Sequence, residues 1–169
     1  AKVIDTTRRV ADLIGYTEHP YDALLDHYEP QATIKQINPL LVGVGDSLRS
    51  IIPGIIEKCQ SWKPCSGDFP EAVQSQLNQR VVEAIGYSFE SGRIDSAPHP
   101  FMTTIALADA RMTTRYHNEN FQSALLTTLH EAGHALYEQG IDPAYEGTPL
   151  GETVSLGIHE SQSRLWENL

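Results

Sequence analysis

SALLTTLHEAGHALYE, residues 123–138, holds the most informative pattern in the chain, because it places His130 and His134 four residues apart in a helical sequence. On an α-helix two residues at this spacing lie about 40° apart on one face, so both imidazoles can bind one metal ion. Glu131 lies about 100° round the helix from His130, where a general base for a metal-activated water is needed. The pattern predicts a metal helix with Glu131 as its base.

The alternative is a core helix that carries two histidines and no metal. A helical wheel argues against it, because an apolar stripe already accounts for the core-facing side and the histidines lie on another face. The members of that stripe are Phe121, Leu125, Leu129, Ala132 and Leu136. Buried imidazoles need polar partners, and a metal ion suits two of them.

The composition is that of an ordinary folded protein. The 169 residues are 40% hydrophobic and carry a net charge of −10 at pH 7, so we expect a single domain over residues 1–169. The acidic balance argues against a surface that binds nucleic acid or a membrane, because both need clustered Lys and Arg.

We see no apolar run of about eighteen residues and no signal-peptide pattern. Cys59 and Cys65 are too few to staple a secreted domain, which favours free thiols and a cytoplasmic protein.

Apolar periodicity predicts a mainly α-helical fold with a small sheet beside the metal helix. Helices are expected over residues 3–14, 21–28, 33–59, 69–86, 123–138 and 152–169. After Gly86 the periodicity changes, and short strands are expected over residues 87–90, 101–108 and 109–116. The last helix has an apolar stripe formed by Val154, Ile158, Leu165 and Leu169.

The strand over residues 109–116 has a polar face. Asp109, Arg111 and Thr113 are two residues apart and would lie on one side of it, opposite Ala110, Met112 and Thr114. Such a face is either a solvated edge or part of a substrate site. Its place just before the metal helix favours the second interpretation, because an edge strand in zinc peptidases can hold an extended peptide.

A catalytic zinc site needs a third protein ligand. The candidates are His99, His117, His159 and Glu160. We favour Glu160, because it lies off the apolar stripe of the last helix and because Gly157, one turn earlier, would let the two helices approach closely. The alternative is a surface glutamate that pairs with Arg164 four residues later.

Five motifs together resemble one family. In chain order they are YDALLDHYEP at 21–30, HPF at 99–101, DARMT at 109–113, HEAGH at 130–134 and HESQS at 159–163. The combination resembles the thermostable carboxypeptidase family related to carboxypeptidase Taq, over essentially the whole chain. The resemblance implies an almost all-helical, zincin-like fold and a metal-dependent exopeptidase that removes residues from peptide C-termini.

The resemblance also implies roles for single residues. His130, His134 and Glu160 would bind the metal, which is zinc, with cobalt as an alternative, and Glu131 would be the catalytic base. Groups on the substrate side or behind the ligands would be His99, Asp109, Arg111, Thr113 and Arg164. Members of this family are similar in being cytoplasmic and often dimeric, so the whole protein is expected to be a homodimer.

The chain departs from the family in one respect. The family continues beyond HESQS with an Ile-Arg-x-x-Ala-Asp segment and a Gln-Asp-x-His-Trp segment, which help to bind the substrate, and neither is present here. We therefore expect a central portion of a larger metallocarboxypeptidase catalytic domain.

Arg111 and Arg115 are candidates for binding the terminal carboxylate, although the arginine of the missing Ile-Arg-x-x-Ala-Asp segment is the better candidate. The alternatives are an endopeptidase or aminopeptidase with the same metal site, or a non-catalytic metal-binding fragment.

Overall fold

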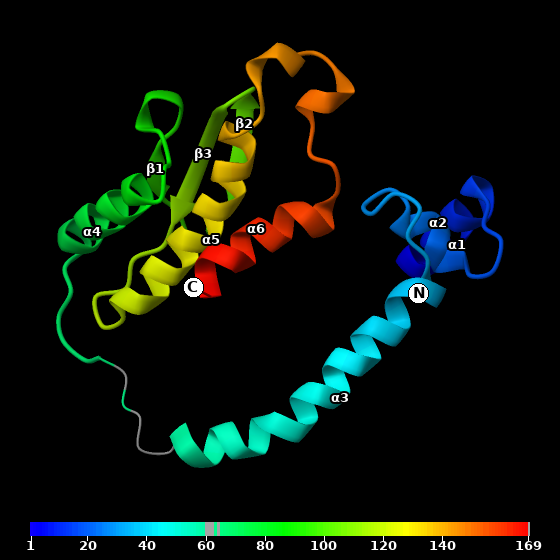
Figure 1. Cartoon of the computed structure of the whole chain (residues 1–169), viewed down its shortest axis with the longest axis horizontal. Helices are drawn as coiled ribbons and strands as arrows, with labels where there is room; N and C mark the ends of the chain where they lie inside the picture. Colours follow the sequence, from blue (N-terminus) through cyan, green and yellow to red (C-terminus); the bar gives the residue numbers. More distant parts are fainter. Residues whose placement is uncertain (60–62, 64, 169) are drawn as a thin grey trace. The chain divides into compact units, whose positions relative to one another are not determined.

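The computed structural model describes residues 1–59, 63 and 65–168, and it is mainly helical with one small sheet (Figure 1). The predicted fold class is thereby confirmed. Residue contacts divide the chain into two compact units, Ala1–Pro64 and Cys65–Leu169, and each is described by itself. The expectation of a single domain over residues 1–169 stays a prediction.

The first unit contains three helices, α1 (Lys2–Ile14), α2 (Pro20–Leu25) and α3 (Ile34–Cys59). α1 ends at Ile14 and is followed by the cap residue Gly15, whose φ of 89° is a conformation that glycine adopts without strain. Asp22 Oδ1 accepts a hydrogen bond of 2.7 Å from the Ile34 backbone N–H, which ties α2 to the start of α3. All three helices confirm the prediction, although α2 ends at Leu25 rather than at Tyr28.

α3 runs for 26 residues without a break, and Pro39 and Pro53 both lie inside it (Figure 1). None of its residues is buried within the part of the chain that the structure describes. Its exposed large apolar side chains are Leu40, Leu41, Val42, Val44, Leu48, Ile51, Ile52, Ile55 and Ile56. By length and composition α3 is apolar enough to cross a membrane, which qualifies the expectation that the chain has no such segment. A core helix of a soluble protein can have the same length and composition.

The second unit is built around one helix, α5, which contacts the sheet and two further helices. Its elements are α4 (Glu71–Ala84), η1 (Phe89–Ser91), β1 (Ile94–Ser96), β2 (Met102–Ala106), β3 (Asp109–Thr114), α5 (Phe121–Gln139), η2 (Pro143–Tyr145), η3 (Pro149–Gly151) and α6 (Leu156–Asn168). α5 packs against β3, α4 and α6, so it separates the sheet from α6 (Figure 1).

The sheet has the strand order β1-β3-β2, with β1 parallel and β2 antiparallel to the central β3. Two predictions about it are wrong. Residues 87–90 form no strand, because Ser88 caps a short 3₁₀ helix and the first strand comes later, at Ile94–Ser96. The strand that begins at Asp109 is not an edge strand, because it pairs on both sides. The edge strand that follows the HPF motif is β2.

One face of β3 packs against α5 and forms the core of the second unit. Ala110 and Met112 are buried on this face, and they belong to an apolar cluster completed by Val82, Tyr87, Ala132 and Ala135. Next to this cluster, the hydroxyl oxygens of Thr114 and Thr128 lie 2.9 Å apart. Asn78 of α4 donates a hydrogen bond of 2.8 Å to Thr128 Oγ1, so these buried polar groups satisfy one another.

α5 packs mainly through small residues, and of the predicted apolar stripe Ala132 and Leu136 contribute to the core cluster or pack against it. Its buried residues are Ala124, Thr128, Glu131, Ala132, Gly133 and Ala135. Of the predicted stripe only Ala132 is buried, and the larger members Phe121, Leu125, Leu129 and Leu136 are partly exposed. Small side chains let α5 lie close to both β3 and α6.

α6 begins at Leu156, later than predicted, after the two 3₁₀ turns. The members of its predicted apolar stripe that the structure describes are exposed, namely Val154, Ile158 and Leu165. Leu169 lies outside the described residues. The packed face of α6 instead carries Ser163, which is buried. A Cβ atom on Gly133 of α5 would lie 2.5 Å from Ser163 Cα, so the two helices approach closely at Gly133. The close approach predicted at Gly157 stays a prediction.

Candidate metal centre

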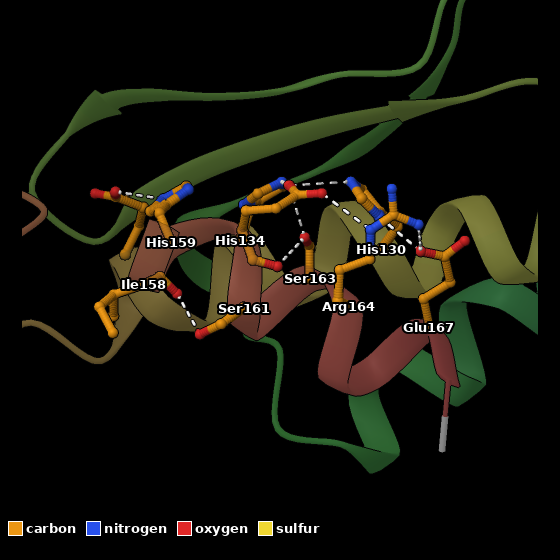
Figure 2. A network of polar contacts seen from close by, with 10 residues as sticks. His130, His134, Ile158, His159, Ser161, Ser163, Arg164 and Glu167 are labelled. Carbon is orange, nitrogen blue, oxygen red and sulfur yellow. Dashed lines mark hydrogen bonds and ion pairs between the residues drawn. The ribbon is translucent and has the colours of Figure 1, made fainter. Parts of the chain in front are cut away.

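Two imidazoles and one carboxylate converge between α5 and α6. His130 and His134 project from one face of α5, with ring centroids 5.1 Å apart (Figure 2). Glu160 of α6 lies opposite, with Oε2 3.3 Å from His134 Nε2 and 3.7 Å from His130 Nε2. One donor atom from each residue lies within 4.8 Å of the other two. The fold therefore brings together the three residues that were predicted as metal ligands.

Glu160 is held in place from its own helix. Ser163 Oγ donates a hydrogen bond of 3.0 Å to Glu160 Oε2, and Arg164 Nε donates one of 3.0 Å to Glu160 Oε1. Burial raises the pKa of Glu160, but these hydrogen bonds and the nearby imidazoles outweigh it, so the net shift is downward. Glu160 therefore pairs with Arg164, as the alternative interpretation held, and faces the imidazoles at the same time.

His130 is oriented by a second carboxylate on α6. Glu167 Oε2 lies 3.0 Å from His130 Nδ1 and accepts a hydrogen bond of 2.8 Å from Arg164 Nη1 (Figure 2). The hydrogen bond with His130 is the main cause of a lowered pKa at Glu167. A histidine that binds a metal usually bonds a carboxylate or carbonyl through its other ring nitrogen. This contact therefore leaves His130 Nε2 as the atom available to a metal.

His134 is placed by a different kind of contact. Its Nδ1 atom is buried and makes no hydrogen bond of ordinary length within the described residues. Its ring stacks on that of His159, which in turn pairs with Glu138. Burial lowers the pKa of His134, and the imidazoles of His159 and His130 lower it further. The lowered pKa favours the neutral imidazole, which is the form that binds metal ions.

Glu131 lies beside the three donors and is only 8% exposed. Burial raises the pKa of its carboxyl, and the neighbouring His130 and the Met102 backbone N–H oppose this shift without cancelling it. A carboxylate with a raised pKa is a stronger base. Its burial and its pKa therefore suit the predicted role of proton acceptor.

Thr113 holds the turn that carries His99. The Phe101 backbone N–H donates a hydrogen bond of 3.0 Å to Thr113 Oγ1, and the Thr113 N–H donates one of 2.8 Å to Phe101 O. Thr113 Oγ1 also lies 3.4 Å from His99 O. His99 is close enough to Glu131 to oppose the upward shift of its pKa. Of the predicted substrate-side residues, His99 is thus near the site and Thr113 is linked to it through the turn.

Asp109 and Arg111 are paired with each other. They lie on the face of β3 opposite Ala110 and Met112, which pack against α5. Arg111 donates two hydrogen bonds to Asp109, of 2.8 Å from Nε and 2.7 Å from Nη2. The hydrogen bonding from Arg111 is the main cause of a lowered pKa at Asp109. Their predicted contact with substrate stays a prediction.

Glu138 and Glu167 belong to this network but were not predicted. Each could have been found from helical spacing. Glu138 follows His134 by four residues, and Glu167 follows Glu160 by seven, and both spacings place two side chains on one face of a helix. His159 was considered only as a ligand, whereas its Nε2 atom lies 2.9 Å from Glu138 Oε1.

Comparison with known proteins gives one consistent result. The family model described as carboxypeptidase Taq (M32) metallopeptidase matches residues 1–169. Carboxypeptidase 1 of Bacillus subtilis is 42% identical over 172 residues, which cover 99% of this chain and 34% of that protein. Thermostable carboxypeptidase 1 of Thermus thermophilus is 42% identical over 151 residues, which cover 88% of this chain and 30% of that protein.

Solved structures agree with the sequence comparison. An M32 carboxypeptidase from Deinococcus radiodurans R1 superimposes with a TM-score of 0.91 at 38% identity, over 99% of this chain and 34% of that chain. A Pyrococcus furiosus carboxypeptidase gives a TM-score of 0.90 at 36% identity with the same coverage. The chain thus spans about a third of the length of the relatives it matches.

Proposed function

Because this chain belongs to the carboxypeptidase Taq (M32) family of metallopeptidases, we propose that it carries the metal centre of a carboxypeptidase that removes C-terminal residues from peptides. The observation that carries the proposal is the convergence of His130 Nε2, His134 Nε2 and Glu160 Oε2 beside the buried Glu131.

The three donors suit a zinc ion, with cobalt as the alternative metal. Two imidazole nitrogens and one carboxylate oxygen are a donor set found in catalytic zinc sites, which keep a fourth position open. His130 Nδ1 is already bonded to Glu167, and the buried His134 favours its neutral form, so both residues can offer Nε2. A bound ion of this kind supplies Lewis-acid chemistry, because it polarises the scissile carbonyl and acidifies the attacking water.

Glu131 is proposed as the general base. Its carboxylate would accept a proton from the attacking water and pass it to the amine that leaves the peptide. Burial keeps bulk water away from this carboxylate and raises its pKa, so it holds the transferred proton more firmly than an exposed glutamate would. His99, which lies near Glu131, is proposed to contact the substrate.

Recognition of the terminal carboxylate is proposed to need a cationic group outside this chain. Arg111 is already bonded through two nitrogens to Asp109. Arg115 is exposed and donates a hydrogen bond of 3.4 Å to Pro98 O.

The whole protein is further proposed to be a cytoplasmic homodimer that binds no nucleic acid and no membrane. The exposed, unpaired thiols of Cys59 and Cys65 support a reducing compartment.

A second candidate function is a non-catalytic metal-binding fragment. The chain spans about a third of the length of its relatives, and a substrate pocket that draws on the rest would be incomplete here. In that case the chain would bind zinc and hydrolyse no peptide. An endopeptidase or aminopeptidase with the same donors is the remaining alternative, and it would also cleave a peptide whose C-terminus is amidated.

The test combines zinc binding with peptide hydrolysis for the native chain and for Glu131→Gln. We expect one zinc ion per chain in both proteins, because Glu131 is not a ligand. Hydrolysis of a peptide with a free C-terminus should fall about 10²- to 10⁴-fold in Glu131→Gln. Glu83→Gln, which alters an exposed glutamate on α4, is the matched control and should behave like the native chain.

Each other outcome changes the proposal in a defined way. Retained hydrolysis in Glu131→Gln would remove Glu131 as the base. Stoichiometric zinc without any hydrolysis by the native chain would leave the metal-binding fragment as its function. Equal cleavage of the free and the amidated peptide would exclude a carboxypeptidase.

A further inference from the structure

A nearly buried ion pair lies directly behind one of the two proposed metal-binding histidines. His159, in the first turn of α6, and Glu138, near the end of α5, are joined by a contact of 2.9 Å between Nε2 and Oε1. Their side chains are only 13% and 12% exposed. Burying two such groups is costly unless they are paired. Nothing in the proposed chemistry uses them, so their place in the fold needs another explanation.

The ring of His159 lies flat against the ring of His134. The two ring centroids are 4.5 Å apart and their planes differ by 18° (Figure 2). Tyr137 meets His159 edge-on, with centroids 5.2 Å apart, and its hydroxyl accepts a hydrogen bond of 3.3 Å from the Val154 N–H. Glu138 and Tyr137 therefore fix His159 from two directions, and His159 presents one face to His134.

The two proposed histidine ligands are supported in different ways. His130 has the usual arrangement, in which Nδ1 bonds the carboxylate of Glu167. The Nδ1 atom of His134 has no carboxylate partner and makes no hydrogen bond of ordinary length within the described residues. The group that acts on this imidazole as a hydrogen-bond partner is the His159 backbone, which opposes the lowering of its pKa by burial. Without a carboxylate on Nδ1, rotation of the imidazole about χ2 is less restrained, and a ligand that can rotate loses conformational entropy when it binds a metal. The stacked ring of His159 is the contact that can restrain the ring plane of His134.

We propose that His159, held by Glu138, is a positioning residue that sets the ring plane of His134 and so keeps its Nε2 atom aimed at the point shared with His130 and Glu160. The proposal rests on the metal site proposed above. In this proposal the stacked ring of His159 orients His134, as the hydrogen bond with Glu167 orients His130. Loss of the ring, rather than loss of the ion pair, should then weaken metal binding.

Two variants separate the ring from the ion pair. His159→Gln keeps a hydrogen-bond donor for Glu138 but removes the ring. The double variant Glu138→Gln/His159→Phe keeps a flat ring against His134 and leaves no buried charge unpaired. The affinity for Zn²⁺ is measured for each folded variant by competition with a chromophoric chelator. We expect about 10- to 100-fold weaker binding for His159→Gln and a change of less than about threefold for the double variant.

Thr128→Val is the control for a purely structural effect. Thr128 is a buried residue of α5 that bonds Asn78, so its loss should lower stability without changing Zn²⁺ affinity. The absorption spectrum of the Co²⁺-loaded protein is a second readout, because it reports ligand geometry. It should change in His159→Gln and stay the same in the double variant and in Thr128→Val.

The outcomes distinguish this inference from the proposed function. If the native chain binds no Zn²⁺, the metal site itself fails. If the native chain binds Zn²⁺ and His159→Gln binds it equally well, the metal site stands and the positioning role is overturned. The same conclusion follows if the double variant loses affinity as strongly as His159→Gln, because then the ion pair and not the ring supports the site.

Discussion

Tyr87 shows how burial of one phenol ties the sheet to its helices. The residue is 3% exposed, and its hydroxyl donates a hydrogen bond of 2.8 Å to Ala110 O of β3. Burial raises the pKa of Tyr87 to about 12, and the hydrogen bond with the Arg93 backbone only partly offsets this shift. The folded protein therefore keeps the phenol protonated at a pH where the unfolded chain does not.

This difference predicts a loss of stability at alkaline pH. Below pH 10 both states hold the proton and the stability is fully present. Between pH 10 and about pH 12 the unfolded chain releases its proton while the folded protein retains it. The free energy of unfolding should therefore fall by about 1.4 kcal/mol per pH unit, or roughly 2–3 kcal/mol in all. Urea unfolding at a series of pH values from 9 to 12 measures the slope.

Tyr87→Phe is the variant that tests the assignment. It should be less stable than the native chain at pH 9, because Ala110 O loses its donor, and its stability should fall less steeply above pH 10. Tyr145→Phe, at an exposed position, should keep the native slope. Parallel slopes for the native chain and Tyr87→Phe would show that other groups cause the alkaline loss.

At the scale of residues, the helix period was enough to predict the two histidines and not enough to predict their supports. His130 and His134 are on one helix, so their spacing singled them out. Glu160 was favoured among four candidates because it lies off the predicted apolar stripe of the next helix, although the described members of that stripe are exposed in the structure. The contact between His159 and Glu138 joins two helices. It depends on how α5 and α6 are rotated against each other, which no spacing along one helix determines.

At the scale of elements, the close packing of α5 against α6 depends on a glycine, which has no side chain. Gly133 lies between the two histidines of the metal motif, and a Cβ atom there would lie 2.5 Å from Ser163 Cα. Backbone atoms cannot rotate out of the way, so a side chain at this position must push the helices apart. Glu160, which is carried by α6, would then move away from the imidazoles.

Gly133→Ala is therefore expected to lower both stability and metal affinity. Overpacking of this kind costs about 1–3 kcal/mol of unfolding free energy, and the affinity for Zn²⁺ should fall at least tenfold because the third donor is displaced. Urea unfolding and chelator competition measure the two effects. Gly54→Ala in α3 is the matched control, since no atom lies within 4 Å of a Cβ there.

In Gly54→Ala the helix should gain about 0.5–1 kcal/mol, the usual advantage of alanine over glycine inside a helix. If Gly133→Ala also raised stability and kept native zinc affinity, the two helices would not need to touch so closely. The close contact would then have no part in placing Glu160.

The helices were easier to predict than the packed faces of helices. Apolar periodicity found every long helix, but it assigned the wrong buried face to α6, where Ile158 and Leu165 are exposed and Ser163 is buried. The reason is physical. Close helix packing selects small residues at the contact, and hydrophobicity scales give small polar residues such as serine no weight. The same bias hid the alanine and glycine face of α5.

At the scale of the whole molecule, the proposed metal centre belongs to one of the two compact units. His99, Glu131, the three proposed ligands and their supports all lie within Cys65–Leu169. We expect a chain of residues 65–169 to bind Zn²⁺ with an affinity within about twofold of the full chain. Chelator competition on both proteins measures this, and His134→Ala in the shorter chain is the control that should abolish binding. A loss of zinc affinity in the unaltered shorter chain would show that residues 1–64 support the site.

What the sequence could not predict at this scale is the surroundings of α3. Its apolar periodicity was recognised, yet none of its residues is buried within the described residues. A stripe of apolar side chains indicates that something covers it, and periodicity carries no information about what that is.

The short distance along the chain between the donors has a consequence for the order of events during synthesis. The three donors lie within residues 130–160, on α5 and α6, which follow each other directly apart from two 3₁₀ turns. At 5–20 residues per second a segment of roughly thirty residues is translated in about 2–6 seconds. Closing so short a loop costs little entropy. We therefore expect the proposed metal ligands to be able to bind an ion as soon as α6 has emerged from the ribosome.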